Sequence, residues 1–321
     1  MLELFSEIQD DLRAVEERLR LVVQAPDPIL TETSTHLFDA GGKRLRPALV
    51  LFGAKFYNFN LEKVIPLAVA LELIHTASLV HDDVVDAAMT RRGKPTVKAK
   101  WGNSISTHIG AYLFARSLVL LSTYEDKPLI SRVLSETSVK MSEGEIQQIS
   151  SSFDVFQNLK DYFYRINRKT ALLIAASTQL GAVACGAPPG IYMPLRRYGH
   201  NIGMAFQITD DILDVVSDQT LLGKPVGGDL RQGIITLPVI YALKNSPKRE
   251  RLIELVKKAE KSEAEVQEAI QAVTECGSIE YSFDVAAKYI NKAKNELRVL
   301  PPISVRETLA LAADFIGIRK Y

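Results

Sequence analysis

Two aspartate clusters with the same spacing are the residues of this chain best placed to carry chemistry. They are residues 82–86 (DDVVD) and 210–214 (DDILD), about 130 residues apart, and each ends an apolar stretch with helical periodicity. On a helix, residues i and i+4 share a face, so the first and last aspartates of each cluster stand together. Carboxylates crowded on an apolar helix are costly unless a positive charge neutralises them.

Magnesium together with a diphosphate is the ligand that this pattern favours. Calcium sites usually take ligands from a loop with backbone carbonyls, whereas paired carboxylates completed by water and phosphate oxygens suit magnesium. A single cluster is equally well explained by a solvated acidic helix face. Two clusters that both end apolar runs make chance a poor explanation.

Three short basic segments could bind the diphosphate. They are residues 41–47 (GGKRLRP), residues 91–95 (RRGKP) and Lys169. The glycines of the first segment let the backbone approach an anion. Taken alone, that segment could be a helix start with solvated charges, and basic loops such as the second are common. Lys169 interrupts an apolar helix, where an unpaired lysine is disfavoured, so function is favoured there.

The elements that must position these residues are helices. Apolar residues recur every three or four positions from Leu2 to Val22, and similar segments fill most of the chain between loop signals at 25–28, 40–42, 58–60, 92–95, 186–190 and 223–228. Residues 171–176 are hydrophobic nearly all round, as in a central helix, and residues 249–275 form an amphipathic cover. The pattern predicts an all-α fold with residues 1–321 as a single domain.

Composition excludes several classes of function. The 321 residues include 39 basic and 38 acidic ones, a net charge of +1, which argues against a nucleic-acid partner. The two cysteines, Cys185 and Cys276, have neither zinc-site nor disulfide-framework spacing, which predicts a cytoplasmic protein. The acidic N-terminus does not read as an export signal. The apolar stretches 65–80 and 112–121 are shorter than the ~20 residues of a membrane span.

The order of these motifs resembles that of the trans-prenyl diphosphate synthases over nearly the whole chain. The matching segments are 41–47, the two aspartate clusters, 91–93 (RRG), 169–170 (KT) and 223–225 (GKP). Residues 75–83 (HTASLVHDD), 227–230 (GGDL) and 316–321 (IGIRKY) are most similar to the bacterial two-component synthases of long chains. The resemblance implies an isoprenoid-synthase-type helical bundle around a central cavity.

The reaction that this family implies is a magnesium-dependent prenyl transfer. An allylic diphosphate, here farnesyl diphosphate, loses pyrophosphate, and the carbocation is attacked by isopentenyl diphosphate in successive cycles. Asp82, Asp86 and Asp210 would hold three Mg²⁺ ions with substrate bound. Asp83, Asp211 and Asp214 would support them directly or through water. Metals and fixed cations that bind the leaving diphosphate as its charge develops lower the barrier.

The remaining site residues are carried over in the same way. Arg91, Lys169 with Thr170, and Lys224 would assist on the allylic side, while Gln207 and Phe206 steer the reacting carbons. Isopentenyl diphosphate would bind without metal against Lys43, Arg46, His75 and Arg92. A histidine such as His75 is more often a core residue, and its position seven residues before Asp82 favours the functional interpretation.

Small residues before the first cluster predict a long product. Ser78 and Ala77 lie one turn before Asp82, and Ile74 lies two turns before it. In the family an aromatic residue near these positions blocks the growing chain. We therefore expect a deep tunnel and an all-trans hexaprenyl or heptaprenyl diphosphate that supplies quinone side chains.

Two positions depart from the family pattern. Ala111 stands where many relatives carry an aspartate, and Ile234 stands near where many carry a lysine. The first change removes a local polar contact and the second removes one potential diphosphate contact. Neither affects an aspartate of the two clusters, so catalytic competence is still expected.

Several alternatives remain open at this stage. A shorter-chain geranylgeranyl or farnesyl diphosphate synthase fits the same motifs, and a non-catalytic helical partner subunit would have lost aspartates that are present here. A terpene cyclase would pair one such cluster with a differently spaced triad. The expected assembly is a homodimer, or a heterodimer or heterotetramer with a small regulatory subunit. We expect no membrane span, and peripheral membrane association through the lipid product.

Overall fold

The computed structural model describes residues 3–216 and 226–318 of the chain. Clustering of the backbone divides it into two compact units, each described here by itself. The first unit consists of Met1–Glu136, Ala176–Arg196 and Leu300–Leu309, and the second of Thr137–Ala175, Arg197–Val299 and Ala310–Tyr321. The expectation of one domain stays a prediction.

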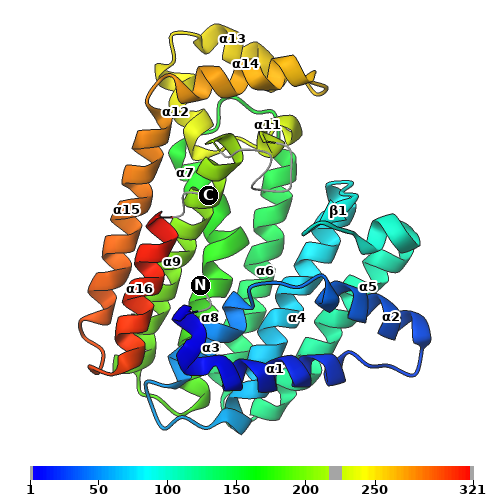
Figure 1. Ribbon diagram of the computed structural model, residues 1–321, viewed down its shortest axis with the longest axis vertical. Helices are drawn as coiled ribbons and strands as arrows, with labels where there is room; N and C mark the ends of the chain where they lie inside the picture. The colour runs from blue at the N-terminus through cyan, green and yellow to red at the C-terminus, as the bar shows by residue number, and fades with distance from the viewer. Residues whose placement is uncertain (1–2, 217–225, 319–321) are drawn as a thin grey trace. The chain divides into compact units, whose positions relative to one another are not determined.

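The described residues are helical apart from connecting loops and one small hairpin, which confirms the all-α prediction (Figure 1). The elements before residue 125 are η1 (Glu3–Ile8), α1 (Gln9–Val22), α2 (Pro28–Asp39), α3 (Leu45–Ala54), α4 (Leu61–Val85), β1 (Thr90–Arg91), β2 (Lys94–Pro95), α5 (Val97–Leu121) and η2 (Ser122–Tyr124). The elements that follow are α6 (Pro128–Ser150), α7 (Leu159–Ile166), η3 (Asn167–Ala171), α8 (Leu172–Ala184), α9 (Pro189–Val216), α11 (Gly228–Gln232), α12 (Leu237–Asn245), α13 (Arg249–Lys257), α14 (Glu263–Thr274), α15 (Ser278–Leu297) and α16 (Ser304–Ile318).

Two boundaries differ from the sequence prediction. The expected first helix is a 3-10 turn, η1, followed by α1, because the backbone at Ile8 leaves the helical region. The expected helical segment 249–275 is two helices, α13 and α14, since Ser262 caps a new helix by accepting a hydrogen bond from the backbone of Glu265. Both differences arise from local backbone geometry that hydrophobic periodicity does not report.

The antiparallel pair α4 and α5 carries the first aspartate cluster in the first unit. Asn60 starts α4 by accepting a hydrogen bond from the backbone of Lys63 at 3.1 Å. At the same end of the pair, Tyr124 donates to the carbonyl of Lys63 and accepts from the amide of Leu67 at 3.1 Å. Near the cluster, His81 packs against Gly110 of α5 so closely that a Cβ at residue 110 would overlap its ring. These contacts fix the register of the two helices.

A tight hairpin joins α4 to α5. Its register pairs Thr90 with Pro95 and Arg91 with Lys94. The two loop residues, Arg92 and Gly93, have φ of 54° and 74°. Positive φ at both loop positions is the geometry of a type I′ turn, which matches the twist of the strands. The turn places an arginine at the tip of the hairpin.

Two glycines allow α3 to pack against the part of α8 that belongs to the first unit. A Cβ at Gly181 would overlap the backbone carbonyl of Val50, and a Cβ at Gly53 would overlap that of Thr178. Backbone atoms cannot rotate out of the way as side chains do. The approach of the two helices is therefore set by the absence of these side chains.

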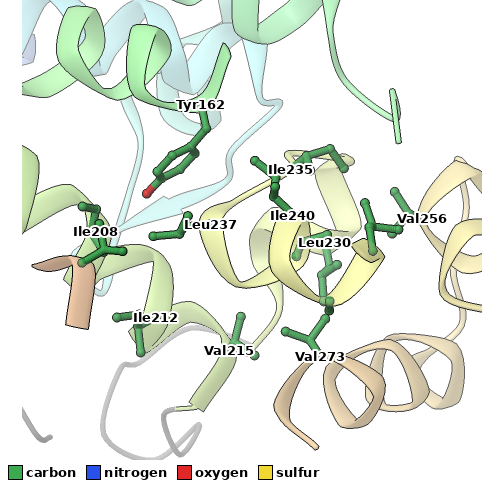
Figure 2. Packing of buried hydrophobic residues seen from close by; sticks show 14 of the residues in the cluster. Tyr162, Ile208, Ile212, Val215, Leu230, Ile235, Leu237, Ile240, Val256 and Val273 are labelled. Atoms are coloured by element: carbon green, nitrogen blue, oxygen red, sulfur yellow. The ribbon is translucent and has the colours of Figure 1, made fainter. Parts of the chain in front are cut away.

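The second unit has a large apolar core around α9 and α12. Ile208 and Ile212 of α9 pack with Leu237 and Ile240 of α12, and Tyr162 of α7 brings its ring to the same cluster (Figure 2). Tyr162 is fully buried. Its hydroxyl therefore needs a partner inside the protein. The second aspartate cluster lies on the same helix, α9, among these core residues.

Two helices are long and apolar enough to cross a membrane by length and composition alone, namely α4 and the segment Val97–Tyr124. Both are longer than the apolar stretches recognised in the sequence. Within the protein, 67% of the apolar window of α4 is buried, against 39% for the second segment. The burial of α4 is that of a core helix.

Replacing Gly181 by alanine tests the close packing of α3 and α8. The new methyl group would overlap the Val50 carbonyl, so we expect a loss of about 1–3 kcal/mol in the free energy of unfolding. Urea unfolding followed by circular dichroism measures it. Gly190→Ala is the matched control, because nothing lies within 4 Å of its new methyl group. Equal stabilities of the two variants would contradict the packing argument.

Candidate active site

The first and last aspartates of the first cluster differ from the middle one in their surroundings. Asp82 and Asp86 are half-buried at the C-terminal end of α4, whereas Asp83 is only 3% exposed. Both carboxylates of the i, i+4 pair are thus partly exposed, and their role as metal ligands stays a prediction. Two carboxylates supply hard oxygen ligands for magnesium, which takes its remaining ligands from water and substrate phosphate.

Asp83 is the partner of an arginine from the hairpin. Arg91 donates to Asp83 Oδ1 through Nε at 2.8 Å, and its Nη2 lies 2.7 Å from the same oxygen. Paired hydrogen bonds from a guanidinium to a carboxylate are strong and directional. The contact therefore fixes the position of Arg91, and the support of the metals by Asp83 stays a prediction.

The basic segment before α3 is held by a buried network. Arg44 lies at φ 47° and donates to Glu16 through Nε at 2.6 Å and Nη2 at 3.0 Å. Arg46, two residues further, is half-buried, and its Nε is buried with no hydrogen-bond partner. Desolvation lowers the pKa of Arg46 to about 10, so it remains a cation at neutral pH. A half-buried cation with an unsatisfied donor is suited to bind an anion.

The hairpin is attached to the end of α2 and the loop that follows. Lys94 donates to the Asp39 carbonyl at 2.5 Å, and Arg92 donates to the carbonyl of Gly41. A Cβ at Gly42 would lie 2.6 Å from Arg92 Nη1, so this glycine makes room for a guanidinium. The basic loop and the basic hairpin thus meet as one cationic surface in the first unit.

A histidine and the single tryptophan lie at the base of the hairpin. His36 Nε2 is 2.7 Å from the carbonyl of Pro95, and the His36 ring meets Trp101 edge-on with centroids 5.1 Å apart. Lys100 lies over the same indole at 4.5 Å. These contacts connect the hairpin with α2 and the start of α5.

His75 is a neutral member of the cationic cluster. Burial lowers its pKa well below the usual 6.5, and the nearby charges of Arg46 and Arg92 lower it further. The imidazole is therefore uncharged at neutral pH. It can offer one hydrogen-bond donor and one acceptor to a diphosphate, but no positive charge.

The second cluster repeats the arrangement of the first. Asp210 and Asp214 are half-buried on α9, whereas Asp211 is 5% exposed. Tyr162 donates to Asp211 Oδ2 at 2.7 Å and Gln207 donates to Oδ1 at 2.8 Å. Burial nevertheless raises the pKa of Asp211 to about 6. Both oxygens of Asp211 accept protein hydrogen bonds, so it anchors α9 to α7, and its support of the metals stays a prediction.

Lys169 and Thr170 lie in a π-helical turn, η3, which joins α7 to α8. Such turns are rare and occur often at functional sites. Thr170 donates to Gln207 Oε1 at 2.6 Å, which connects the turn to Asp211 through Gln207. Lys169 Nζ lies 2.9 Å from Glu145 Oε2 of α6. The predicted pair of residues is thus placed beside the second cluster by an irregular helix.

Asp214 caps the short helix α11. Its carboxylate accepts hydrogen bonds from the amides of Gly228 at 3.2 Å and Asp229 at 3.0 Å. The nearby Asp229 is half-buried, and desolvation and the charges of Asp214 and Asp211 raise the pKa of its carboxyl well above the usual value. The segment 227–230, known from sequence only as part of a resemblance, therefore adds a fourth carboxyl group to the second cluster.

The other predicted residues are distributed as follows. Phe206 is partly buried on α9, and Ile74 and Ala77 are buried on α4 beside the half-buried Ser78. Lys224 lies outside the described residues. The chain-length residues and the steering role of Phe206 remain predictions.

The two departures from the family pattern fall at different kinds of position. Ala111 lies on the exposed side of α5, and Ile234 follows Gly233 in the loop before α12. The amide of Ile234 donates to the Asp229 carbonyl at 2.8 Å. The backbone at residue 234 is therefore fixed whatever its side chain.

Sequence reasoning missed the residues that hold the site in place. Tyr162 and Arg165 carry no recognisable motif, and Arg165 is buried with donations to Gln157 at 2.8 Å and the Ile235 carbonyl at 2.6 Å. Glu72 was visible only as an interruption of an apolar stretch. Among the residues described, no three acidic, histidine or cysteine side chains form a metal site, so water and substrate would have to complete any magnesium sphere.

Comparisons with known proteins agree with these features. Residues 27–273 match the family described as polyprenyl synthetase. The chain is 48% identical over 318 residues to heptaprenyl diphosphate synthase component 2 of Geobacillus stearothermophilus, with 99% of this chain and 98% of the relative covered. It is 45% identical over 317 residues to the protein of the same name from Bacillus subtilis, with 99% and 90% covered. The resemblance to two-component synthases is confirmed.

A solved structure shares the fold. It is a polyprenyl synthase of Caulobacter crescentus, complexed with calcium and isoprenyl diphosphate. The two chains superpose with a TM-score of 0.94 and 35% identity, covering 99% of this chain and 97% of the other. The fold is therefore the all-α fold of the isoprenoid synthases, as the sequence predicted.

Replacing Tyr162 by phenylalanine tests its hydrogen bond to Asp211. Because the folded-state pKa of Asp211 is about 6 and the ordinary value is 3.8, the stability that this group contributes falls as pH rises from 4 to 6. Removing a donor to the ionised form raises that pKa further. We expect Tyr162→Phe to cost about 1–3 kcal/mol at pH 8 and less at pH 5.

Urea unfolding at the two pH values measures the difference, and Tyr124→Phe is the matched control. The Tyr124 hydroxyl is also buried but bonds only to backbone groups of α4. Its loss should cost the same at pH 5 and pH 8. A loss for Tyr162→Phe that does not change with pH would contradict the assignment.

Proposed function

The chain belongs to the polyprenyl synthetase family and is a trans-prenyltransferase, and we propose that it extends farnesyl diphosphate with isopentenyl diphosphate to all-trans hexaprenyl or heptaprenyl diphosphate for quinone side chains. The observation that carries the proposal is the first unit's cluster. Half-buried Asp82 and Asp86 end the same helix that carries His75, with Arg46 and Arg92 nearby. One helix thus carries the proposed metal-binding pair and His75, whose ring lies near the cations of α3 and the hairpin.

Magnesium would be held by Asp82, Asp86 and Asp210, with three ions when substrate is bound. The carboxylate oxygens of these partly exposed aspartates suit a hard cation. When bound, it stabilises the charge that develops on the departing diphosphate. The neighbouring aspartates Asp83 and Asp211 keep Arg91 and Gln207 in place.

The allylic diphosphate would be bound by Arg91, Lys169 and Lys224. Arg91 is fixed by Asp83, and Lys169 is held near Glu145. Cations that are already oriented stabilise the leaving group without reorganisation during the reaction. Gln207, fixed from both sides by Thr170 and Asp211, and Phe206 would steer the reacting carbons.

Isopentenyl diphosphate would be bound by side chains alone. Lys43, Arg46 and Arg92 supply positive charge, and neutral His75 supplies a directed hydrogen bond. Because no metal is concentrated on this diphosphate, its C–O bond is not cleaved. The double bond of isopentenyl diphosphate therefore acts as the nucleophile. The pyrophosphate released from the allylic partner can accept the final proton.

A partner component and cytoplasmic location complete the proposal. The relatives from Bacillus subtilis and Geobacillus stearothermophilus are named as component 2 of their synthases. We propose that this chain acts as a homodimer, or joins a small regulatory subunit in a heterodimer or heterotetramer. The assembly would meet the membrane peripherally, through its lipid product.

Prenyl transfer by the purified chain tests the reaction directly. With magnesium, farnesyl diphosphate and radiolabelled isopentenyl diphosphate, we expect incorporation into long prenyl diphosphates, alone or with a candidate small subunit. Asp82→Ala and Asp210→Ala should each lower turnover at least about 10²-fold while circular dichroism stays unchanged. Asp284→Ala, at an exposed position of α15, is the control. Full activity in either cluster variant would contradict the metal assignment.

Replacing Ala77 by tyrosine tests the tunnel. An aromatic ring at this buried position of α4 should stop elongation early, so we expect products shorter than hexaprenyl diphosphate. Chromatography of the dephosphorylated products gives their length. The same substitution at Ala264, exposed on α14, should leave product length unchanged. An unaltered distribution in folded Ala77→Tyr would reject the tunnel assignment.

A further inference from the structure

Glu72 is a buried carboxylate to which the mechanism above gives no role. It lies in the middle of α4 between Leu71 and Leu73, and it is 3% exposed. Burying an ionised carboxylate costs several kcal/mol unless ion pairs and hydrogen bonds compensate. An apolar residue would suit this part of the helix better. The charge of Glu72 therefore needs a positively charged partner that offsets the cost of its desolvation.

The direct partner of Glu72 is the arginine that begins α3. Arg44 Nη1 lies 3.4 Å from Glu72 Oε1, while its other nitrogens bind Glu16 and the Phe38 carbonyl. The backbone of Arg44 is left-handed, which costs about 1–2 kcal/mol for such a residue. Contacts from two helices and one carbonyl keep it there.

The charge of Glu72 also acts on the two arginines that have no carboxylate of their own in contact. Burial lowers the pKa of Arg46, and Glu72 opposes that shift. Partial burial lowers the pKa of Arg92, and Glu72 is again the largest opposing influence. Arg44, Arg46 and Arg92 would otherwise repel one another around His75. Glu72 is thus an anion shared by three arginines, Arg44 and Arg46 at the start of α3 and Arg92 in the hairpin.

We propose that Glu72 is a positioning residue for the isopentenyl diphosphate site, the buried counter-charge that assembles Arg44, Arg46 and Arg92 before the substrate arrives. The inference rests on the proposed function, because it concerns the substrate site of that reaction. It also predicts the sign of the effect. If Glu72 merely diluted the positive potential, removing its charge would tighten diphosphate binding. If it positions the arginines, removing the charge weakens binding.

Steady-state kinetics of Glu72→Gln with both substrates varied separates these cases. Glutamine keeps the shape of the side chain and removes its charge. We expect the KM for isopentenyl diphosphate to rise at least about tenfold, while kcat and the KM for farnesyl diphosphate stay within about twofold of the wild-type values. This result is expected when a variant binds one substrate more weakly in both the ground state and the transition state. An unchanged or lower KM for isopentenyl diphosphate overturns the proposal, as does an equal rise for both substrates.

Glu16→Gln is the matched control, since it removes the other carboxylate from Arg44 and leaves the charge of Glu72 on Arg46 and Arg92. Its KM for isopentenyl diphosphate should rise less than about threefold. Glu72→Asp, which restores the charge on a shorter side chain, should recover part of the affinity. If Glu72→Gln does not fold, Glu72→Asp must raise the KM for isopentenyl diphosphate more than the KM for farnesyl diphosphate. Equal changes in the two KM values would overturn the proposal.

Calorimetric binding of inorganic pyrophosphate in excess EDTA tests the site without turnover. Wild type should bind it and Glu72→Gln should bind it at least about tenfold more weakly. If this difference in binding is found but the wild type catalyses no prenyl transfer, the proposed function alone is rejected. Prenyl transfer with equal pyrophosphate binding by wild type and Glu72→Gln would reject the role of Glu72 alone.

Discussion

Cations that grip an anion must be held together before the anion is present. Like charges repel, and each loses hydration as it is enclosed by helices, so the structure surrounds them with fixed carboxylates. Arg44 is bound by Glu16 and Glu72, Arg91 by Asp83, and Lys169 by Glu145. Each of these partners comes from a helix that does not carry the cation itself. The helices are thus tied to one another through ion pairs that involve the basic segments.

Helical geometry divides the work within each aspartate cluster. The first and fifth aspartates share a face and stay partly accessible, while the second is turned by about 100° and enters the protein. The inward residue meets Arg91 in one cluster and Tyr162 with Gln207 in the other. A DDxxD string therefore combines two partly exposed carboxylates with one buried anchor. This explains why the adjacent aspartates of the motif differ so strongly in burial.

The sequence predicted those parts of the site that depend on residues close to one another along the chain. Spacing and periodicity predicted the helices, the i, i+4 carboxylate pairs and the basic segments, because these depend on neighbours along one helix. The partners Tyr162, Arg165 and Glu145 could not be predicted, since they meet the site only through packing of separate helices. The π-helical turn at Lys169 and the left-handed backbone at Arg44 also escaped, because both depend on tertiary contacts. Glu72 was noticed, but only its cost to an apolar stretch was apparent.

The contact between His36 and Trp101 has a spectroscopic consequence. This chain has one tryptophan, so all of its red-edge-excited emission comes from a ring beside the hairpin that carries Arg91 and Arg92. His36 contacts both that ring and the carbonyl of Pro95 at the end of the hairpin. A displacement of the hairpin would change the distance of an imidazole, a known type of fluorescence quencher, from the indole. The molecule therefore carries an intrinsic optical probe at the base of its cationic surface, with no label needed.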